Sequence, residues 1–428
     1  MYNFTMKKNL RVRSDDQNFN RNVIANFGDA VFLEAANGMT PLGTIITSML
    51  RYLTPSKTII SLVGALNSIV QGVPQLFAAR KMETAIHLKP LLLFYAFLQR
   101  FMWFAMALLT VTIIPWNKPL FIPFFIITYG VYGYFVGQVS LVWINYMIKM
   151  VPGGSLGRFL GFRAALGSAA AIGGAFLSKW GLERFDFPYN YAFIFCLAGV
   201  MGAASLLFLS STMEGVRQPR PVKPKEMDFL HRAWQIMKKD RNFQAYLLST
   251  MFIVFGKFAF PLQVVYAQEK LGIGVGQVAM ASVALMAGQT VGYLLWGWVV
   301  DHTSFKTSII LSTMFFIPSL ILTYLMHNEW MLYAAVSIFA FSQSARNFGE
   351  NVLVMEMCTE EDRPIYMGLR NGLLGPFFAV STILGGVLTD LIGYRTVVLI
   401  AIPFMVIGAV TNWTMVKTCY QSPKITSG

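Results

Sequence analysis

Apolar runs about 20 residues long alternate with short polar connections along almost the whole chain. A run of this length suits a helix that crosses the hydrocarbon core of a bilayer, whereas the strands of a membrane barrel are about half as long. The pattern therefore predicts an all-α membrane protein with twelve transmembrane helices. The predicted spans are roughly 25–50, 58–80, 90–114, 120–148, 160–179, 190–212, 244–267, 276–300, 307–327, 331–354, 366–388 and 394–416.

One long polar stretch, residues 213–243, interrupts this pattern near the middle of the chain. Three prolines keep its first part, 216–225, extended. Its second part, 226–240, is predicted to form a basic amphipathic helix on the anionic surface of the membrane. The chain is thus divided into an N-terminal six-helix half (1–212), a cytoplasmic basic linker (213–243) and a C-terminal six-helix half (244–428).

Composition supports the membrane class, because 55% of the residues are hydrophobic and only 13% are charged, about half the charge of soluble domains. A net charge of +14 would suggest a nucleic-acid partner for a soluble protein, but basic cytoplasmic loops account for it in a membrane protein. Lys and Arg are concentrated in the connections on the side of the N-terminus. This bias predicts that both termini are cytoplasmic and that the protein is a multi-pass protein of the inner membrane, in contact with lipids and without nucleic acid.

The chemistry of common enzyme and metal sites is missing from the sequence. The three cysteines and four histidines have no spacing typical of a disulfide framework or a metal site. The glycines are not accompanied by a nucleotide-binding motif, and no histidine falls inside a predicted span. We therefore expect no metal, no cofactor and no enzymatic activity.

The two halves repeat short sequences at equivalent places. Asp-Gln-Asn-Phe at 16–19 precedes the first span, and Asp-Arg-Asn-Phe at 240–243 precedes the seventh. Gly-Phe-Arg at 161–163 opens the fifth span, and Gly-Leu-Arg at 368–370 opens the eleventh. Glycine pairs follow further inside both of these spans, where we expect the two halves to move against each other. The matches indicate an internal duplication.

The loop after the eighth span, with Gly297 and Asp301 followed by Lys306, completes a pattern that resembles the major facilitator superfamily of secondary transporters. The resemblance implies two pseudo-symmetric six-helix halves, a central cavity, a small-molecule or ion substrate, and a monomer. It also implies that Asp301 belongs to a cytoplasmic gate. The candidate members and partners of this gate are Lys306, Arg158, Arg363 and Arg370.

The tenth span has a polar stripe on one helical face, formed by Gln343, Arg346, Asn347, Glu350 and Asn351. Arg346 and Glu350 are four residues apart and are predicted to pair along the helix. A stripe of this kind does not face lipid. It lines either the central cavity, as the resemblance implies, or a structural seam between helices.

The first span contains Glu34 and Asn37 on one face, with Asp29 more than one turn closer to its beginning. A carboxyl group near the middle of the membrane can take up and release a proton near neutral pH, which makes Glu34 the first candidate for proton coupling, followed by Asp29 and Glu350. The alternative for Glu34 is a permanent ion pair with a basic residue. The alternative for Asp29 is a hydrated carboxylate near the start of its helix.

Further polar residues lie inside other spans. Lys257, in the seventh, binds either an anionic group of the substrate or a carboxylate of the other half, whereas Arg100, in the third, is expected to pair within its own half. Tyr134, Gln138 and Asn145 of the fourth span are predicted to form a hydrogen-bonding wall of the cavity.

The leading hypothesis is a proton-coupled secondary transporter that moves a small solute by alternating access. The alternatives are a transporter of an inorganic cation such as iron, and a transporter-like receptor or assembly protein that moves no solute.

Overall fold

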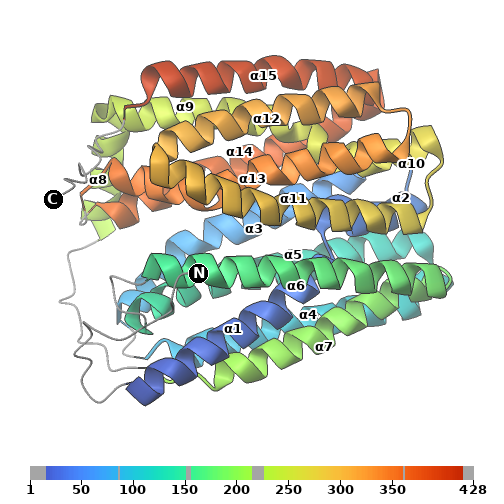
Figure 1. Ribbon diagram of the computed structural model, residues 1–428, viewed down its shortest axis with the longest axis horizontal. Coiled ribbons are helices and arrows are strands. Elements are labelled where there is room, and N and C mark those ends of the chain that lie inside the picture. The colour runs from blue at the N-terminus through green and yellow to red at the C-terminus, as the bar shows by residue number, and fades with distance from the viewer. Residues whose placement is uncertain (1–15, 85–86, 151–155, 215–225, 360–361, 418–428) are drawn as a thin grey trace, which may run out of the picture.

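The computed structural model describes residues 16–84, 87–150, 156–214, 226–359 and 362–417, and these residues are almost entirely helical. Most helices run side by side along one long axis (Figure 1). The N-terminal helices are α1 (Asp16–Met39), η1 (Leu42–Ile46), α2 (Thr47–Leu53), α3 (Lys57–Thr84), α4 (Lys89–Trp116), α5 (Lys118–Met150), α6 (Leu156–Arg184) and α7 (Tyr189–Ser210). The C-terminal helices are α8 (Glu226–Lys239), α9 (Arg241–Gly256), η2 (Lys257–Leu262), α10 (Gln263–Leu271), α11 (Val275–His302), α12 (Phe305–Leu325), α13 (Glu329–Glu356), α14 (Arg363–Ile392) and α15 (Tyr394–Met415).

Nine helices within the described residues are long and apolar enough to cross a membrane. They are α4, α5, α6, α7, the continuous rod of α9, η2 and α10, and then α11, α12, α14 and α15. The protein is therefore a multi-pass integral membrane protein of the helical class. The rod of α1, η1 and α2, together with α3 and α13, would complete the predicted twelve. These three are not among the nine, so the count of twelve stays a prediction.

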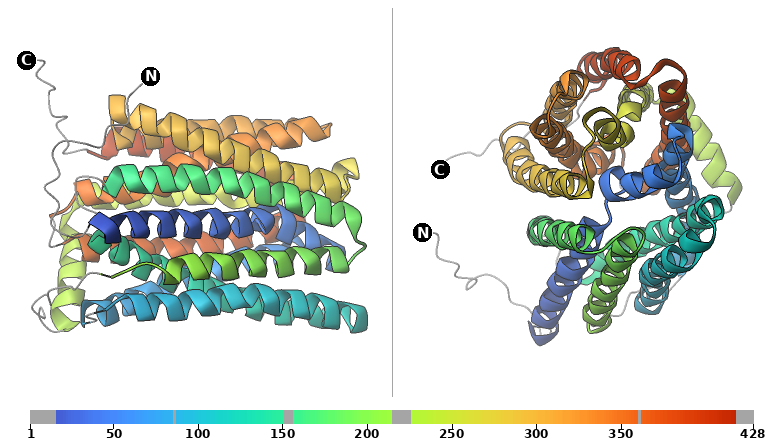
Figure 2. Two further views of the ribbon diagram at one scale, coloured as in Figure 1. Left: turned by 60° about the horizontal axis from the view of Figure 1, so that its bottom comes forward. Right: turned by 90° about the vertical axis from the view of Figure 1, so that its right-hand side faces the viewer.

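The two halves form separate bundles with the same internal packing, as the end-on view in Figure 2 shows. In the first half α1 packs on α6 and α7, and α4 packs on α5 and α7. In the second half α9 packs on α14 and α15, and α12 packs on α13 and α15. Each bundle therefore repeats one arrangement, in agreement with the duplication indicated by the sequence.

Matching side chains fasten the last helix of each half to the first. The amide of Asn22, in α1, bonds the backbone of Met213 beyond α7 at 2.7 and 3.0 Å. The amide of Asn242, in α9, bonds the backbone of Lys417 beyond α15 at 2.6 and 2.8 Å. These contacts satisfy carbonyl and amide groups that a helix end leaves without an intrahelical partner.

The first and seventh rods are both interrupted near their middle. α1 ends at Met39, and Pro41, which lacks an amide hydrogen, precedes the π-helical turn η1. α9 ends at Gly256, and the 3₁₀-helical segment η2, which contains Pro261, follows. Broken helices at equivalent places in two repeats are typical of the substrate site of a secondary transporter.

The halves meet along two pairs of helices, α3 with α14 and α6 with α11. The glycines of α6 were expected at this interface, but Gly174 packs instead on α1 of its own half, where a Cβ atom would collide with the carbonyl oxygen of Ala35. Gly385 has the equivalent place between α14 and Phe258 of η2. Only the next residue, Gly386, lies between the halves, against Lys57 and Ser61. The expectation was therefore wrong for Gly174 and Gly385.

The linker helix α8 lies across the end of the bundle, roughly at right angles to the long helices (Figure 2). It packs on α9 and α14 through Ile236 and Met237, while the side chain of Trp234 is 69% exposed. We call this end, where α1 begins and α15 ends, the terminal end, and the opposite end, with α2 and α10, the far end (Figure 1). The predicted extended segment 216–225 lies outside the described residues.

Candidate functional site

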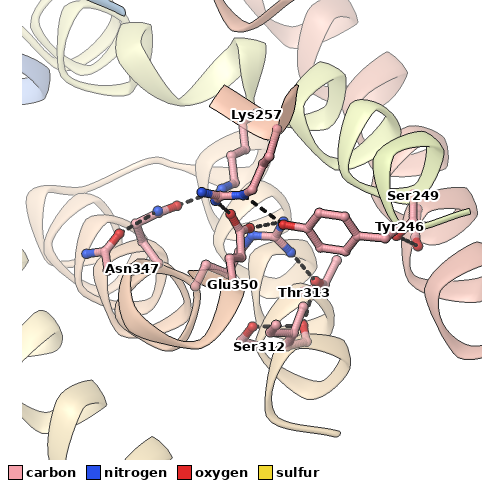
Figure 3. A network of polar contacts seen from close by, with 12 residues as sticks. Tyr246, Ser249, Lys257, Ser312, Thr313, Asn347 and Glu350 are labelled. Carbon is pink, nitrogen blue, oxygen red and sulfur yellow. Dashed lines mark hydrogen bonds and ion pairs between the residues drawn. The ribbon is translucent and has the colours of Figure 1, made fainter. Parts of the chain in front are cut away.

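A cluster of charged side chains lies inside the C-terminal half (Figure 3). Glu350, in α13, forms ion pairs with Arg346, one turn earlier on the same helix, and with Arg370 of α14. The first pair was predicted from the spacing of the two residues and is confirmed. Arg346 is 2% exposed and Glu350 8%, so each charge depends on its partners for the interactions that water would otherwise supply.

Neutral polar groups add further hydrogen bonds to this cluster. Arg370 donates to the hydroxyl of Tyr246 at 2.9 Å and to the side-chain oxygens of Asn351 and Asn371 at 2.9 and 3.1 Å. Arg346 donates to the hydroxyl of Thr313 at 3.2 Å. The guanidinium groups are thereby held in fixed orientations, since each planar fork is bound on several sides.

A chain of hydrogen bonds leads from Lys257 to a more open surface. Lys257, at the break between α9 and η2, donates to the amide oxygen of Gln343 at 2.7 Å. The amide of Gln343 donates to Asn347 at 2.9 Å, and Asn347 donates to the hydroxyl of Tyr293 in α11 at 3.1 Å. Gln289 also donates to this hydroxyl, at 3.0 Å. We call Lys257, Gln343, Asn347 and Tyr293 the polar ladder.

Lys257 has no carboxylate within ion-pair distance among the residues that the structure describes. Its ammonium nitrogen lies 4.9 Å from the centre of the Phe316 ring, a cation–π contact. Of the two roles considered for this lysine, a pair with a carboxylate of the other half is therefore not formed in this conformation.

Glu34 reaches the same region from the N-terminal half. Its carboxylate accepts a hydrogen bond from Asn37 at 3.2 Å, and its stem packs against Gly167 of α6. Its helix, α1, contacts α11 of the other half, which carries Tyr293 of the polar ladder. No basic side chain in the described part of the chain lies within ion-pair distance of Glu34.

Asp29 has a different environment from the one expected. It is 1% exposed, and its two oxygens accept from Arg100 at 3.0 Å and from Arg163 at 2.9 Å. Ser205 donates to it at 2.7 Å. The suggestion of a hydrated carboxylate was therefore wrong, whereas the pairing of Arg100 inside its own half is confirmed.

The three residues expected to form one wall on α5 do not share one environment. Tyr134 lies seven residues after Ile127, hence on the same helical face, and these side chains are 37% and 62% exposed, as on a lipid-facing surface. Gln138 is 2% exposed. The amide of Asn145 donates to the carbonyl of Leu141 on its own helix at 2.9 Å.

The residues assigned to a cytoplasmic gate are only partly described. The side chains of Asp301, Arg158 and Arg363 lie outside the described residues. Lys306 donates to the carbonyls of Trp413 and Val416 at 2.9 and 2.6 Å, at the end of α15. Arg370, considered as a partner of Asp301, instead belongs to the cluster around Glu350.

Several members of the site were not recognised from the sequence. Tyr293 and Gln289 are four residues apart on α11, a spacing that could have marked them as a pair. Tyr246 and Thr313 carry no such signal, because they are uncharged residues among several hydroxyl side chains of α9 and α12, and their spacing within those helices does not indicate an arginine partner. Their roles follow from the arrangement of α9 and α12 around α13.

The halves are bridged by polar contacts at the far end. Glu269 of α10 forms ion pairs with Arg51 of α2 at 2.9 Å and with Lys57 of α3 at 3.0 Å. Asp390, near the end of α14, accepts from the backbone amides of Lys57 and Thr58 at 3.1 and 3.0 Å. A carboxylate of one half thus caps a helix of the other, where the helix dipole favours a negative charge.

Two further bonds join the halves closer to the helix breaks. Gln268 donates to Ser48 at 2.9 Å, and Ser282 donates to Thr44 at 2.6 Å. The far end is therefore fastened by charged and neutral contacts between the halves, whereas several side chains of the terminal end, among them those of Asp301 and Arg363, lie outside the described residues.

A family model described as Major Facilitator Superfamily matches the chain twice, over residues 30–264 and 246–424. These matches cover almost the whole chain. The chain belongs to the Major Facilitator Superfamily. The resemblance noted from the sequence is therefore confirmed, and the double match agrees with the repeated packing of the two halves.

Solved structures of Major Facilitator Superfamily proteins share this fold. The chain is 14% identical to a mutant form of the nucleoside transporter NupG, with a TM-score of 0.70 over 92% of this chain and 100% of that one. The chain is 14% identical to a D-xylose-proton symporter, with a TM-score of 0.68 over 94% of this chain and 98% of that one. It is 11% identical to the human organic anion transporter MFSD10, with a TM-score of 0.65 over 92% of this chain and 99% of that one. At these identities the likeness shows the fold alone, and no curated protein sequence matches the chain.

Proposed function

We propose that the protein is a secondary transporter that moves a small polar solute by alternating access. The observation that carries this proposal is the polar ladder, which lies beside the break in the seventh rod and includes Tyr293 of α11, a helix in contact with α1 of the other half. Discontinuous helices with polar groups between two repeats form the substrate sites of secondary transporters. Membership in the Major Facilitator Superfamily supports the same mechanism.

The conformation fits one end state of such a cycle. The far end is fastened by Glu269 and Asp390. With both termini in the cytoplasm, as the distribution of basic residues predicts, the far end is the outer one, and this is a state that is closed to the outside. Transport then requires the far-end contacts to break while new contacts form at the terminal end.

We assign proton coupling to Glu34. It lies on α1, which contacts α11 of the polar ladder, and it has no basic partner among the described residues, so it can change its charge without breaking an ion pair. Asp29 and Glu350, the other two candidates, are each held by two arginines, and a proton on either would leave those arginines unpaired. One of the solved relatives in fold is a proton symporter.

Reconstitution of the purified protein tests the proposal. Proteoliposomes loaded with a candidate solute should take up the labelled solute in exchange, without any gradient of protons. An inward proton gradient should then drive accumulation, and a protonophore should abolish it.

Two results would separate the parts of this proposal. Exchange that persists while the proton gradient has no effect would remove proton coupling and leave the transporter. A protein that binds a solute tightly but never exchanges it would be a receptor with a transporter fold.

A further inference from the structure

The charges around the polar ladder do not balance. Three basic side chains, Lys257, Arg346 and Arg370, come from three helices, and Glu350 is the acidic side chain among them. Burial and the two arginines disfavour the charged form of Lys257 in the absence of a further anion. The basic side chains on the C-terminal side of the site therefore outnumber the acidic one by two.

This excess costs energy in an apolar environment, because like charges repel more strongly where water does not screen them. Glu34, across the interface, supplies one further negative charge when it is ionised, and one positive charge still remains. No other acidic side chain in the described helices acts on Lys257. An anion bound from outside the protein can supply the missing negative charge.

The basic side chains of this cluster differ in how accessible they are to a solute. Arg346 is 2% exposed and is enclosed by Glu350 and Thr313. Lys257 is half-buried and continues into Gln343 and Asn347, and the side chain of Asn347 is exposed. The positive charge is thus available at Lys257, at one end of a row of amide and hydroxyl groups (Figure 3).

We propose that the transported solute is a hydroxylated organic anion. Its carboxylate or phosphate group binds the ammonium group of Lys257, with support from the field of Arg370. Its hydroxyl groups bind the polar ladder, since amide and phenol side chains can both donate and accept hydrogen bonds. This inference rests on the proposed transport function and names the substrate class for the same site.

The protonation of Glu34 then has a defined effect on the affinity for the anion. An ionised Glu34 repels an anion at the polar ladder, and a protonated one does not. Anion and proton therefore favour each other's binding, and such a positive linkage is required of a symporter. A neutral solute would not respond to the charge of Glu34 in this way.

A set of matched probes tests the charge preference on the purified full-length protein in lipid nanodiscs. Glucose, glucosamine, glucuronate and glucose 6-phosphate present one hydroxylated ring with no charge, a positive charge, a carboxylate and a phosphate. Thermal stabilisation and calorimetry should detect binding of glucuronate or glucose 6-phosphate and weaker or no binding of the other two. The same compounds are then offered for exchange in proteoliposomes.

Variants distinguish the proposed contact from a general effect of charge. Lys257→Gln should weaken anion binding roughly 10- to 100-fold, the typical worth of a hydrogen bond to a charged group. Lys257→Arg should retain it within a few-fold. Asn347→Asp, which adds a negative charge at an exposed position, should weaken it as well, whereas Glu34→Gln should tighten it.

Three outcomes would overturn the inference. Preferred binding and exchange of glucose or glucosamine would show a transporter of another substrate class and leave the proposed function intact. Anion binding that is equally strong in Lys257→Gln would place the anion elsewhere. If none of the four probes binds or is exchanged, the proposed anion site is wrong. Exchange of any unrelated solute would still support the proposed transport function.

Discussion

The two halves each contain a buried carboxylate between two arginines, yet the two clusters differ in what surrounds them. Asp29 is 1% exposed and all its contacts lie within the N-terminal bundle. Glu350 is 8% exposed, and its cluster continues into the polar ladder and the exposed side chain of Asn347. The first cluster is closed, and the second is open towards the other half.

One arginine of each cluster comes from the duplicated sequence. Arg163 follows Gly-Phe at the start of α6, and Arg370 follows Gly-Leu at the start of α14. Arg163 pairs with the first helix of its half, through Asp29. Arg370 reaches the corresponding helix through the hydroxyl of Tyr246 and forms its ion pair with α13. The comparison indicates that one ancestral arrangement serves packing in the N-terminal half, whereas under the proposed function its counterpart in the C-terminal half supports the solute site.

The largest expected effect is the loss of stability in Asp29→Asn. Arg100 and Arg163 would remain buried without a counter-charge, and breaking a buried pair in this way costs about 3–5 kcal/mol of unfolding free energy. Thermal unfolding in detergent measures the change. The control is Glu34→Gln on the same helix, which should cost less than about 1 kcal/mol, because Glu34 has no basic partner in the described residues. Equal effects of the two variants would contradict the distinction between the clusters.

Glu350→Gln should destabilise the protein less, by about 1.5–3 kcal/mol, since its arginines keep several neutral hydrogen-bond partners. Because this cluster is open to the solute, an added anion should replace part of the lost charge. We expect glucuronate or glucose 6-phosphate to raise the melting temperature of Glu350→Gln more than that of Asp29→Asn. A similar rise in both variants would mean that the two clusters are equally accessible.

Glu34→Gln should separate exchange from accumulation. A glutamine imitates the protonated carboxyl group permanently, so solute exchange should persist at a rate within a few-fold of the unaltered protein, whereas accumulation driven by a proton gradient should be lost. Uptake in proteoliposomes with and without a gradient measures both. Accumulation at the normal rate would exclude Glu34 as the proton carrier and return Asp29 and Glu350 to consideration.

The smallest expected effect concerns the far end, where solvent-accessible ion pairs hold the halves together. Glu269→Gln removes the pairs with Arg51 and Lys57, which together contribute about 1 kcal/mol, a shift of about fivefold between conformations. Distances between spin labels on α2 and α10 should show a larger open population at the far end. Glu183→Gln at the same end, a carboxylate whose one ion pair lies within α6, is the control, and an equal shift there would contradict this role of Glu269.

Much of the architecture could be predicted, because the bilayer restricts what a long apolar run can become. A run of about 20 residues has to satisfy its backbone internally and so becomes a helix, and the repeated short sequences indicated two similar halves. Helical periodicity also placed Arg346 beside Glu350. The same periodicity placed Tyr134 and Gln138 on one face of α5, but it did not indicate that Tyr134 is exposed and Gln138 buried.

The sequence by itself determined the membrane class, the two similar halves and the face of α13 that carries charge, because these depend on spacing within single helices. The tertiary structure alone decided the partners between helices. Arg370 meets Glu350 rather than a gate residue, and Arg163 joins Arg100 on Asp29. The physical reason is that a buried charge is stabilised by whichever opposite charge packing brings within about 4 Å. That distance depends on how the helices of a half pack together, and it cannot be deduced from the spacing of residues within a single helix.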